Sequence, residues 1–125
     1  MELIIRNTDS QPIYEQIAAQ LRRQILSGAL APGEALPSIR GLAKDLKISV
    51  ITTKRAYDEL EAAGFINTVA GKGCFVAEQN LELVLAQQLQ QLSARLAEAV
   101  ELGRSCGMTE PELTALLRRK WEDTP

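Results

Sequence analysis

The sequence contains no histidine, and aromatic residues make up only 4% of its 125 residues. A serine or cysteine hydrolase usually needs a histidine base, so the composition argues against these classes of enzyme. The two cysteines, Cys74 and Cys106, stand alone, without the paired spacing of a zinc site or a redox motif. We therefore expect no catalytic activity, no cofactor and no metal.

We interpret both cysteines as reduced packing residues of a cytosolic protein, with a disulfide or a redox sensor as the alternative. The sequence also lacks a run of about 18 apolar residues, which a membrane-spanning helix would need. Its first residues lack the basic start and the apolar centre of a secretion signal. These absences predict a cytoplasmic protein that does not insert into a membrane.

Acidic residues slightly exceed basic ones, and the formal net charge is −2. Residues 1–78 carry nine Lys or Arg against nine Asp or Glu, whereas residues 79–125 carry five against seven. The most basic stretch is 40–55, where a single acid faces five basic residues: Arg40, Lys44, Lys47, Lys54 and Arg55. Because affinity for phosphate depends on the local surface, the small negative total does not exclude binding to nucleic acid.

Apolar residues recur at helical spacing in three segments of the first half of the chain. Ser38 and Ser49 are typical N-cap residues, whereas Gly28 and Gly64 are typical of helix ends. The pattern predicts helices over about 12–27, 39–46 and 50–63. The short turn between the second and the third is that of a helix-turn-helix.

Two β-strands are predicted after the third helix, over residues 65–69 and 74–77, with a glycine-containing hairpin between them. The hairpin carries one basic residue, Lys72, which suits a tip that approaches a phosphate or the minor groove. A helix-turn-helix with such an attached wing places its third helix in the DNA major groove. Residues 1–78 therefore predict a winged helix-turn-helix DNA-binding domain.

The last third of the chain has a different character. Leucines at steps of three and four predict a long amphipathic helix over about 80–105, and a capping box at Thr109 and Glu112 starts a last helix over about 110–122. We interpret the stripe as a dimer seam, with packing against the chain's own winged domain as the alternative: Leu81, Leu85, Leu89, Leu92 and Leu96. The predicted fold is mainly α with a small β-wing, and residues 79–125 form a two-helix dimerisation tail.

The ordered motifs between residues 32 and 76 resemble the winged helix-turn-helix signature of GntR-family transcription regulators. They are Pro-Gly, Leu-Pro-Ser-x-Arg, Leu-Ala, Ser-x-x-Thr, Ala-Tyr-x-x-Leu, Gly-x-Ile and Gly-x-Gly-x-Phe-Val, at positions 32–33, 36–40, 42–43, 49–52, 56–60, 64–66 and 71–76. The start of the first helix, at residues 12–17, and the short tail resemble the YtrA-type subfamily in particular.

The resemblance implies a homodimeric transcription regulator, usually a repressor, that binds a palindromic double-stranded DNA operator. In this subfamily it often controls an adjacent ABC-transporter operon. The larger effector domains of other branches, and the aminotransferase-like domain of the MocR branch, do not fit into the tail. A small-molecule effector stays open as a further partner, in a cleft between tail and wing or across the dimer seam.

The resemblance assigns DNA contacts to Arg40, to Thr52 and Lys54 in the recognition helix, and to Gly71 in the wing. Arginine offers a planar fork to phosphate or to a guanine edge, and a helix N-terminus favours phosphate. A helical turn cannot aim four consecutive residues at one groove, and capping explains Ser49 equally well. The local chemistry nevertheless adds four candidates: Ser49, Thr53, Arg55 and Lys72.

One departure concerns the start of the recognition helix. Other branches of the family place an arginine there, where this chain has Val50 and Ile51. An apolar side chain at this point could touch a thymine methyl group or pack within the protein.

The alternative function is a winged-helix protein-interaction adaptor that does not bind DNA sequence-specifically, with the leucine-rich tail capturing a foreign helix. The basic stretch 40–55 favours DNA, because an adaptor has no need of it.

Overall fold

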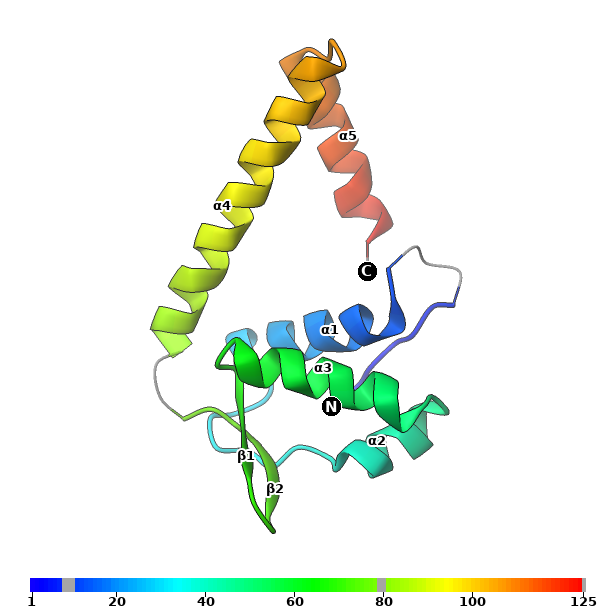
Figure 1. Cartoon of the computed structure of the whole chain (residues 1–125), viewed down its shortest axis with the longest axis vertical. Helices are drawn as coiled ribbons and strands as arrows, with labels where there is room; N and C mark the ends of the chain where they lie inside the picture. Colours follow the sequence, from blue (N-terminus) through cyan, green and yellow to red (C-terminus); the bar gives the residue numbers. More distant parts are fainter. Residues whose placement is uncertain (8–10, 79–80, 125) are drawn as a thin grey trace. The chain divides into compact units, whose positions relative to one another are not determined.

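A computed structural model describes residues 1–7, 11–78 and 81–124. Contacts between Cα atoms divide the chain into two compact units, Met1–Leu85 and Ala86–Pro125. The first unit is a winged helix-turn-helix, which confirms the predicted fold class (Figure 1). The elements in chain order are α1 (Ile13–Ser27), α2 (Ile39–Leu46), α3 (Val50–Ala62), β1 (Ile66–Val69), β2 (Gly73–Val76), α4 (Leu81–Ser105) and α5 (Glu110–Asp123). The predicted start of the fourth helix, at residue 80, lies outside the described residues.

Within the described residues, the predicted helices agree with those of the structure to within one residue at each end. Ser38 and Ser49 cap α2 and α3, and Gly28 ends α1 in the left-handed conformation with a φ of 85°. Lys47, between α2 and α3, also adopts the left-handed conformation, with a φ of 57°. Its neighbour Ile48 donates a backbone hydrogen bond of 3.0 Å to the Ala43 carbonyl, which closes the tight turn between α2 and α3.

One face of α3 forms the centre of the first unit. Ala56, Tyr57 and Leu60 are buried, and they share a core with Ile17 and Leu21 of α1. The Tyr57 hydroxyl donates a hydrogen bond of 2.8 Å to the Pro37 carbonyl, just before the N-cap of α2. Burial raises the pKa of Tyr57, which therefore stays a neutral donor. This bond ties the start of α2 to the middle of α3.

The wing is fixed to the same segment by backbone hydrogen bonds. Strands β1 and β2 pair antiparallel, and residues 33–36 run along the outer side of β2. Gly33 and Leu36 donate to the carbonyls of Val76 and Cys74, and Val76 donates to Glu34, each at 2.9 Å. The chain then enters α2 directly. The wing, α2 and α3 are therefore held in one arrangement.

Glutamines of α1 hold the N-terminal segment, which the sequence predicts only as extended. Gln16 bonds both backbone groups of Arg6, and Gln20 bonds both backbone groups of Ile4, at 2.6–2.9 Å. Gln24 donates to the Glu2 carbonyl at 2.8 Å. Side chains four residues apart share one face of a helix, so these glutamines replace a partner strand. They satisfy backbone groups that would otherwise need water.

The first turn of α4 belongs to the core of the winged unit. Val84 is buried and Leu81 packs against the same core, and a Cβ atom on Gly64 would lie only 3.0 Å from Val84 Cγ2. The sequence predicts a domain boundary after residue 78, whereas the contacts place it after Leu85. Leu81 is half-buried against this core, which favours the alternative of packing against the chain's own winged domain at this position; its place in a dimer seam stays a prediction.

In the second unit, α4 and α5 diverge from a tight turn (Figure 1). The predicted capping box is present: the Glu112 backbone donates to Thr109 Oγ1, and Glu112 Oε1 accepts from the Thr109 backbone at 2.9 Å. Hydrogen bonds from Thr109 lower the pKa of Glu112.

The prediction that both cysteines are packing residues is confirmed for Cys74, which is buried, and wrong for Cys106, which lies exposed after α4. None of the described helices combines the length and the hydropathy that a membrane span requires.

The Tyr57→Phe substitution tests the bond between α3 and the entry to α2. We expect it to lower the free energy of unfolding by about 1–2 kcal/mol, because it leaves the Pro37 carbonyl without its donor. Urea unfolding of the purified protein measures this. Tyr14→Phe is the matched control: its hydroxyl donates only a long hydrogen bond of 3.3 Å to Glu15, so its removal should lower the free energy of unfolding clearly less than the loss of the Tyr57 hydroxyl. Equal costs for the two variants would contradict the role of Tyr57.

Candidate nucleic-acid interface

The N-terminal turn of α2 presents Arg40 to solvent. Ser38 Oγ accepts a hydrogen bond of 2.9 Å from the Gly41 backbone, which fixes this turn, and Arg40 is the second residue of the helix. In the part of the chain that the structure describes, no ion pair holds its guanidinium. Arg40 therefore keeps its full set of donors for an external anion.

Ser49 and Thr52 shape the N-terminal turn of α3. Ser49 Oγ accepts from the Thr52 backbone at 3.0 Å and donates to Thr52 Oγ1 at 2.8 Å. The two hydroxyls thus support each other at the surface. Ser49 acts as a cap, and both side chains stay close to the free N–H groups of the helix end, where a phosphate would be favoured.

The helix-turn-helix pair lacks the acidic residues that begin the other helices. Acids occupy the first turn of α1, α4 and α5, where they complement the helix dipole, but α2 and α3 have none. An acid at these positions would repel a phosphate. The two N-terminal turns are therefore left open to an anion.

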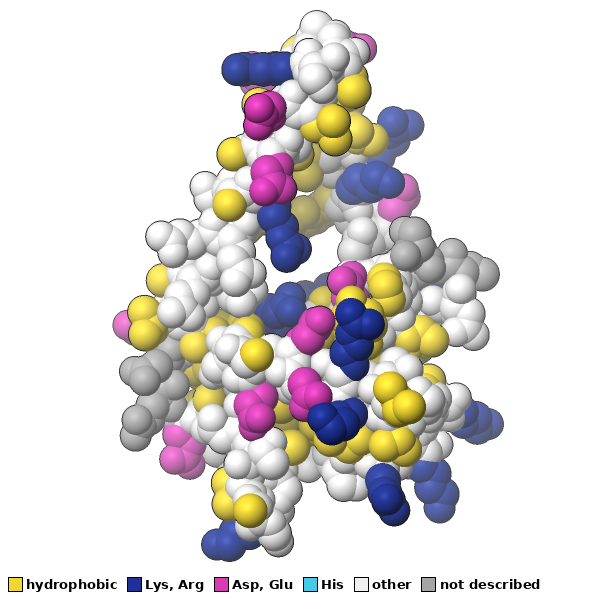
Figure 2. Space-filling view, viewed as in Figure 1, with side chains coloured by type: hydrophobic (Ala, Val, Ile, Leu, Met, Phe, Trp, Pro, Cys, Tyr) yellow, Lys and Arg dark blue, Asp and Glu magenta, His cyan; other side chains and the backbone are white. Residues whose placement is uncertain are grey.

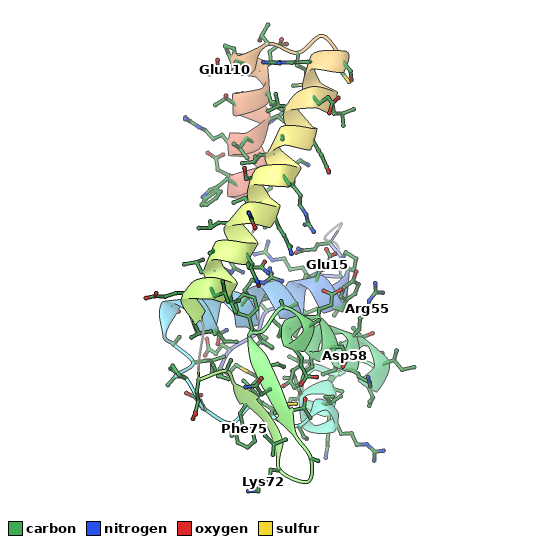
Figure 3. All side chains as sticks on the ribbon, turned by 60° about the vertical axis from the view of Figure 1, so that its left-hand side comes forward. Glu15, Arg55, Asp58, Lys72, Phe75 and Glu110 are labelled. Atoms are coloured by element: carbon green, nitrogen blue, oxygen red, sulfur yellow. The ribbon has the colours of Figure 1, made fainter. Side chains whose placement is uncertain are left out.

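Lys54 and Arg55 lie on the exposed side of α3, and each already has a neighbour. Lys54 Nζ forms an ion pair of 2.7 Å with Asp58, and this hydrogen bond raises the pKa of the lysine. The Arg55 guanidinium stacks on the Tyr14 ring, 3.8 Å from its centroid, beside α1 (Figure 3). A DNA contact from Lys54 would require the lysine to leave Asp58, whereas Arg55 is turned towards α1.

Thr53 does not belong to this surface. Its side chain is fully buried, and its hydroxyl donates a hydrogen bond of 3.1 Å to the Ser49 carbonyl inside the helix. The sequence-based assignment of Thr53 as a DNA contact is wrong, because this residue faces the core together with Ala56 and Tyr57.

The wing carries its candidates at the tip. Lys72 is exposed there and points away from the domain (Figure 3). Its backbone donates to the Val69 carbonyl at 2.9 Å, and Gly71 adopts a φ of 75°. This tight turn brings backbone and one positive charge to the end of the hairpin.

Charge is distributed unevenly over the winged unit. Lys and Arg side chains project over α2 and at the tip of the wing, whereas acids gather over the middle of this face (Figure 2). The acids of α3 lie in its second half, at Asp58, Glu59 and Glu61. DNA is therefore favoured at the start of α3 and disfavoured at its end.

The sequence left two roles open for Val50 and Ile51, a contact with a thymine methyl group or packing within the protein. The structure shows whether they are packed in the core. Ile51 is 81% exposed and Val50 is 46% exposed, so neither is packed in the core. The usable signal in the sequence was their spacing from Ala56, Tyr57 and Leu60, which places Ile51 on the opposite side of α3.

Helices α4 and α5 expose a continuous apolar surface. Along α4 the exposed fraction of the stripe Leu85, Leu89, Leu92, Leu96 and Val100 lies between 39% and 55%. A groove of about 370 Å³ between α4 and α5 continues it, lined by Leu96, Val100, Leu113, Leu116 and Leu117 among others. On α5, which buries no residue, Trp121 is 81% exposed. A surface of this kind typically marks an interaction site.

Residues 13–76 match the family of bacterial regulatory proteins named gntR, over the same segment that builds the winged unit. The chain belongs to the GntR family. It is 34% identical over 91 residues to the HTH-type transcriptional repressor YtrA of Bacillus subtilis (strain 168), which covers 73% of this chain and 70% of that protein. This GntR-family protein is therefore a DNA-binding transcription regulator.

Two solved structures extend the comparison. A protein described as a transcriptional antiterminator from Listeria monocytogenes EGD-e is 31% identical, with a TM-score of 0.76 over 99% of this chain and 92% of its own. The DNA-binding domain of AraR, in complex with operator ORX1, is 26% identical, with a TM-score of 0.54 over 62% of this chain and 96% of its own. The first likeness covers both units, whereas the second covers a shorter part.

The Asp58→Asn substitution tests whether the ion pair with Lys54 restrains DNA binding. We expect affinity for a random duplex to rise about two- to threefold at low salt, because the lysine loses a competing partner. Fluorescence anisotropy with labelled DNA measures it. Glu59→Gln is the matched control, since it removes the same charge without touching the pair. An equal gain from both variants would show that only the net charge matters.

Proposed function

We propose that this protein binds a palindromic operator as a homodimer and represses transcription, with an adjacent ABC-transporter operon as its target. The observation that carries the proposal is the pair of acid-free helix starts in α2 and α3, with Arg40 exposed on one and the Ser49–Thr52 hydroxyls on the other. The repressor name of the Bacillus relative and the operator bound to the AraR domain support it.

In this proposal the start of α3 enters the major groove, as in other helix-turn-helix proteins. Arg40 grips a phosphate or a guanine edge from α2, because its guanidinium offers two parallel donors. Lys54 leaves Asp58 and neutralises a phosphate. Ser49 and Thr52 lie beside the sugar-phosphate backbone of the DNA. At the wing, Lys72 and the Gly71 backbone approach the neighbouring minor groove. Each phosphate contact releases counterions, so binding weakens as salt increases.

The second chain of the homodimer is bound through the tail. The stripe from Leu85 to Val100 and the α4–α5 groove together leave more aliphatic surface in water than an isolated helical hairpin tolerates well. The tail of a second copy covers this surface under two-fold symmetry, because such an interface uses the same patch on both chains. Two winged units joined in this way would match half-sites about one helical turn apart. A small-molecule effector bound across this seam would act by changing that spacing.

The Arg40→Ala substitution tests the reading surface. We expect affinity for a selected operator to fall by about tenfold or more, and the slope of log K against log salt to become shallower. Electrophoretic mobility shift and anisotropy titrations at several salt concentrations measure both. Arg104→Ala, which removes the same charge from the end of α4, should change neither. Unchanged affinity of the Arg40 variant would remove this residue from the interface.

The Leu92→Lys substitution tests the seam. We expect a monomer with a normal helical circular dichroism spectrum, since the side chain is 53% exposed in the single chain and its loss opens no cavity. Sedimentation equilibrium measures the mass. Leu102→Lys is the matched control, because Leu102 is 67% exposed but lies off the stripe. A dimer that survives the first substitution as well as the second would overturn the assignment of this face.

The adaptor alternative is separated by the same titrations. An adaptor predicts no preference for any duplex over a random sequence, and no dependence on Arg40. The acid-free helix starts favour DNA over this alternative, because a protein partner offers no reason to exclude acids there.

A further inference from the structure

Ile51 is an exposed apolar residue in the first turn of α3, the proposed recognition helix. It is 81% exposed, the second residue of α3, and it points away from the core. The buried residues Thr53, Ala56, Tyr57 and Leu60 mark the opposite side of the helix, since successive residues turn by ~100°. Ile51 therefore stands at the centre of the outward face, in the first turn.

Its position is not explained by the stability of the protein. Little of the apolar area of the side chain is buried in the folded chain. A β-branched residue is also a weaker helix former than alanine or glutamate. Residues on either side of the same face are charged, with Lys54 one turn further on. Even together with its exposed neighbour Val50, Ile51 forms too small an apolar patch for a stable protein contact.

DNA offers one apolar partner at this place. The base edges in the major groove are polar except for the methyl group at C5 of thymine, which 5-methylcytosine also carries. The first residues of a recognition helix are those that reach base edges. Around Ile51 there is no acid in the first turn to hold a phosphate away. In such a contact, the methyl group and the isoleucine side chain would both be removed from water, which is favourable.

We propose that Ile51 is a specificity-determining residue that contacts the C5 methyl group of one pyrimidine in each operator half-site. This inference rests on the proposed function, because it needs the start of α3 to lie in the major groove. It commits the operator to a thymine, or to a methylated cytosine, at that position. Arg40 and Lys54 provide affinity, whereas Ile51 provides part of the choice of base.

The experiment begins with selection of bound duplexes from a random DNA library with the full chain. Failure at this step would refute the proposed function itself. Each thymine of the selected half-site is then replaced in turn by deoxyuridine, which removes only the methyl group. We expect one position per half-site at which the wild-type protein loses affinity by about fourfold, equivalent to ~0.8 kcal/mol for one buried methyl group.

Ile51→Ala connects the loss to this side chain. The variant should bind the thymine and deoxyuridine forms of that position equally, while its free energy of unfolding in urea is no lower than that of the wild type, because the side chain is exposed and alanine is the better helix former. Val50→Ala is the matched control, a neighbouring exposed β-branched residue, and it should keep the fourfold difference at that position. A methyl effect that survives in Ile51→Ala, or no methyl effect at any position, would overturn the inference.

A second arm separates the two sources of the methyl group. Cytosine and 5-methylcytosine are placed at the same position, paired with guanine. A gain of about fourfold for the methylated base in the wild type, absent in Ile51→Ala, would show that the protein reads the methyl group wherever it is carried. A gain that is equal in both proteins would assign the effect to DNA shape, against the inference.

Discussion

The packing of α3 around Tyr57 is the constraint on which the rest of the winged unit depends. One side of the helix is buried against α1, and the hydroxyl of the same tyrosine holds the carbonyl that precedes α2. Because residues 33–36 also pair with β2, the wing is aligned by the segment that leads into α2. A protein that binds DNA through several contacts needs them held relative to one another, and here backbone hydrogen bonds and one buried phenol contribute to this.

The two N-terminal turns then differ from the rest of the molecule in charge rather than in shape. The other helices begin with glutamate, which stabilises a helix end in water. In α2 and α3 that stabilisation is absent, and each serine cap accepts from only one of the free backbone N–H groups. The acids of α3 begin only at Asp58, so the helix changes from receptive to repulsive along its length. A chain with a small negative total can thus present a surface fit for phosphate.

Much of this could be predicted from sequence, because the relevant signals are local. Ser38, Ser49 and Gly28 mark helix ends through their own backbone chemistry, and the Thr109–Glu112 box forms as its spacing requires. What differed from these expectations has two origins: helical geometry within α3, and packing between distant segments. Thr53 looked like a surface hydroxyl beside Thr52, yet helical geometry turns it into the core. Leu81 continued a leucine pattern, but the glycine at position 64 lets the first turn of α4 pack against the winged unit. The glutamines of α1 gave no signal at all, since their partners are backbone groups of residues 2–6.

The two thiols differ sharply in accessibility, and this has a practical consequence. Cys74 lies inside the winged unit, whereas Cys106 is open to solvent in the turn that follows α4. A maleimide reagent under native conditions would attach a fluorophore or a nitroxide at one defined site on the tail, without prior mutagenesis. In an assembly of two chains, such labels would report the separation of the two turns directly, by energy transfer or by pulsed electron resonance.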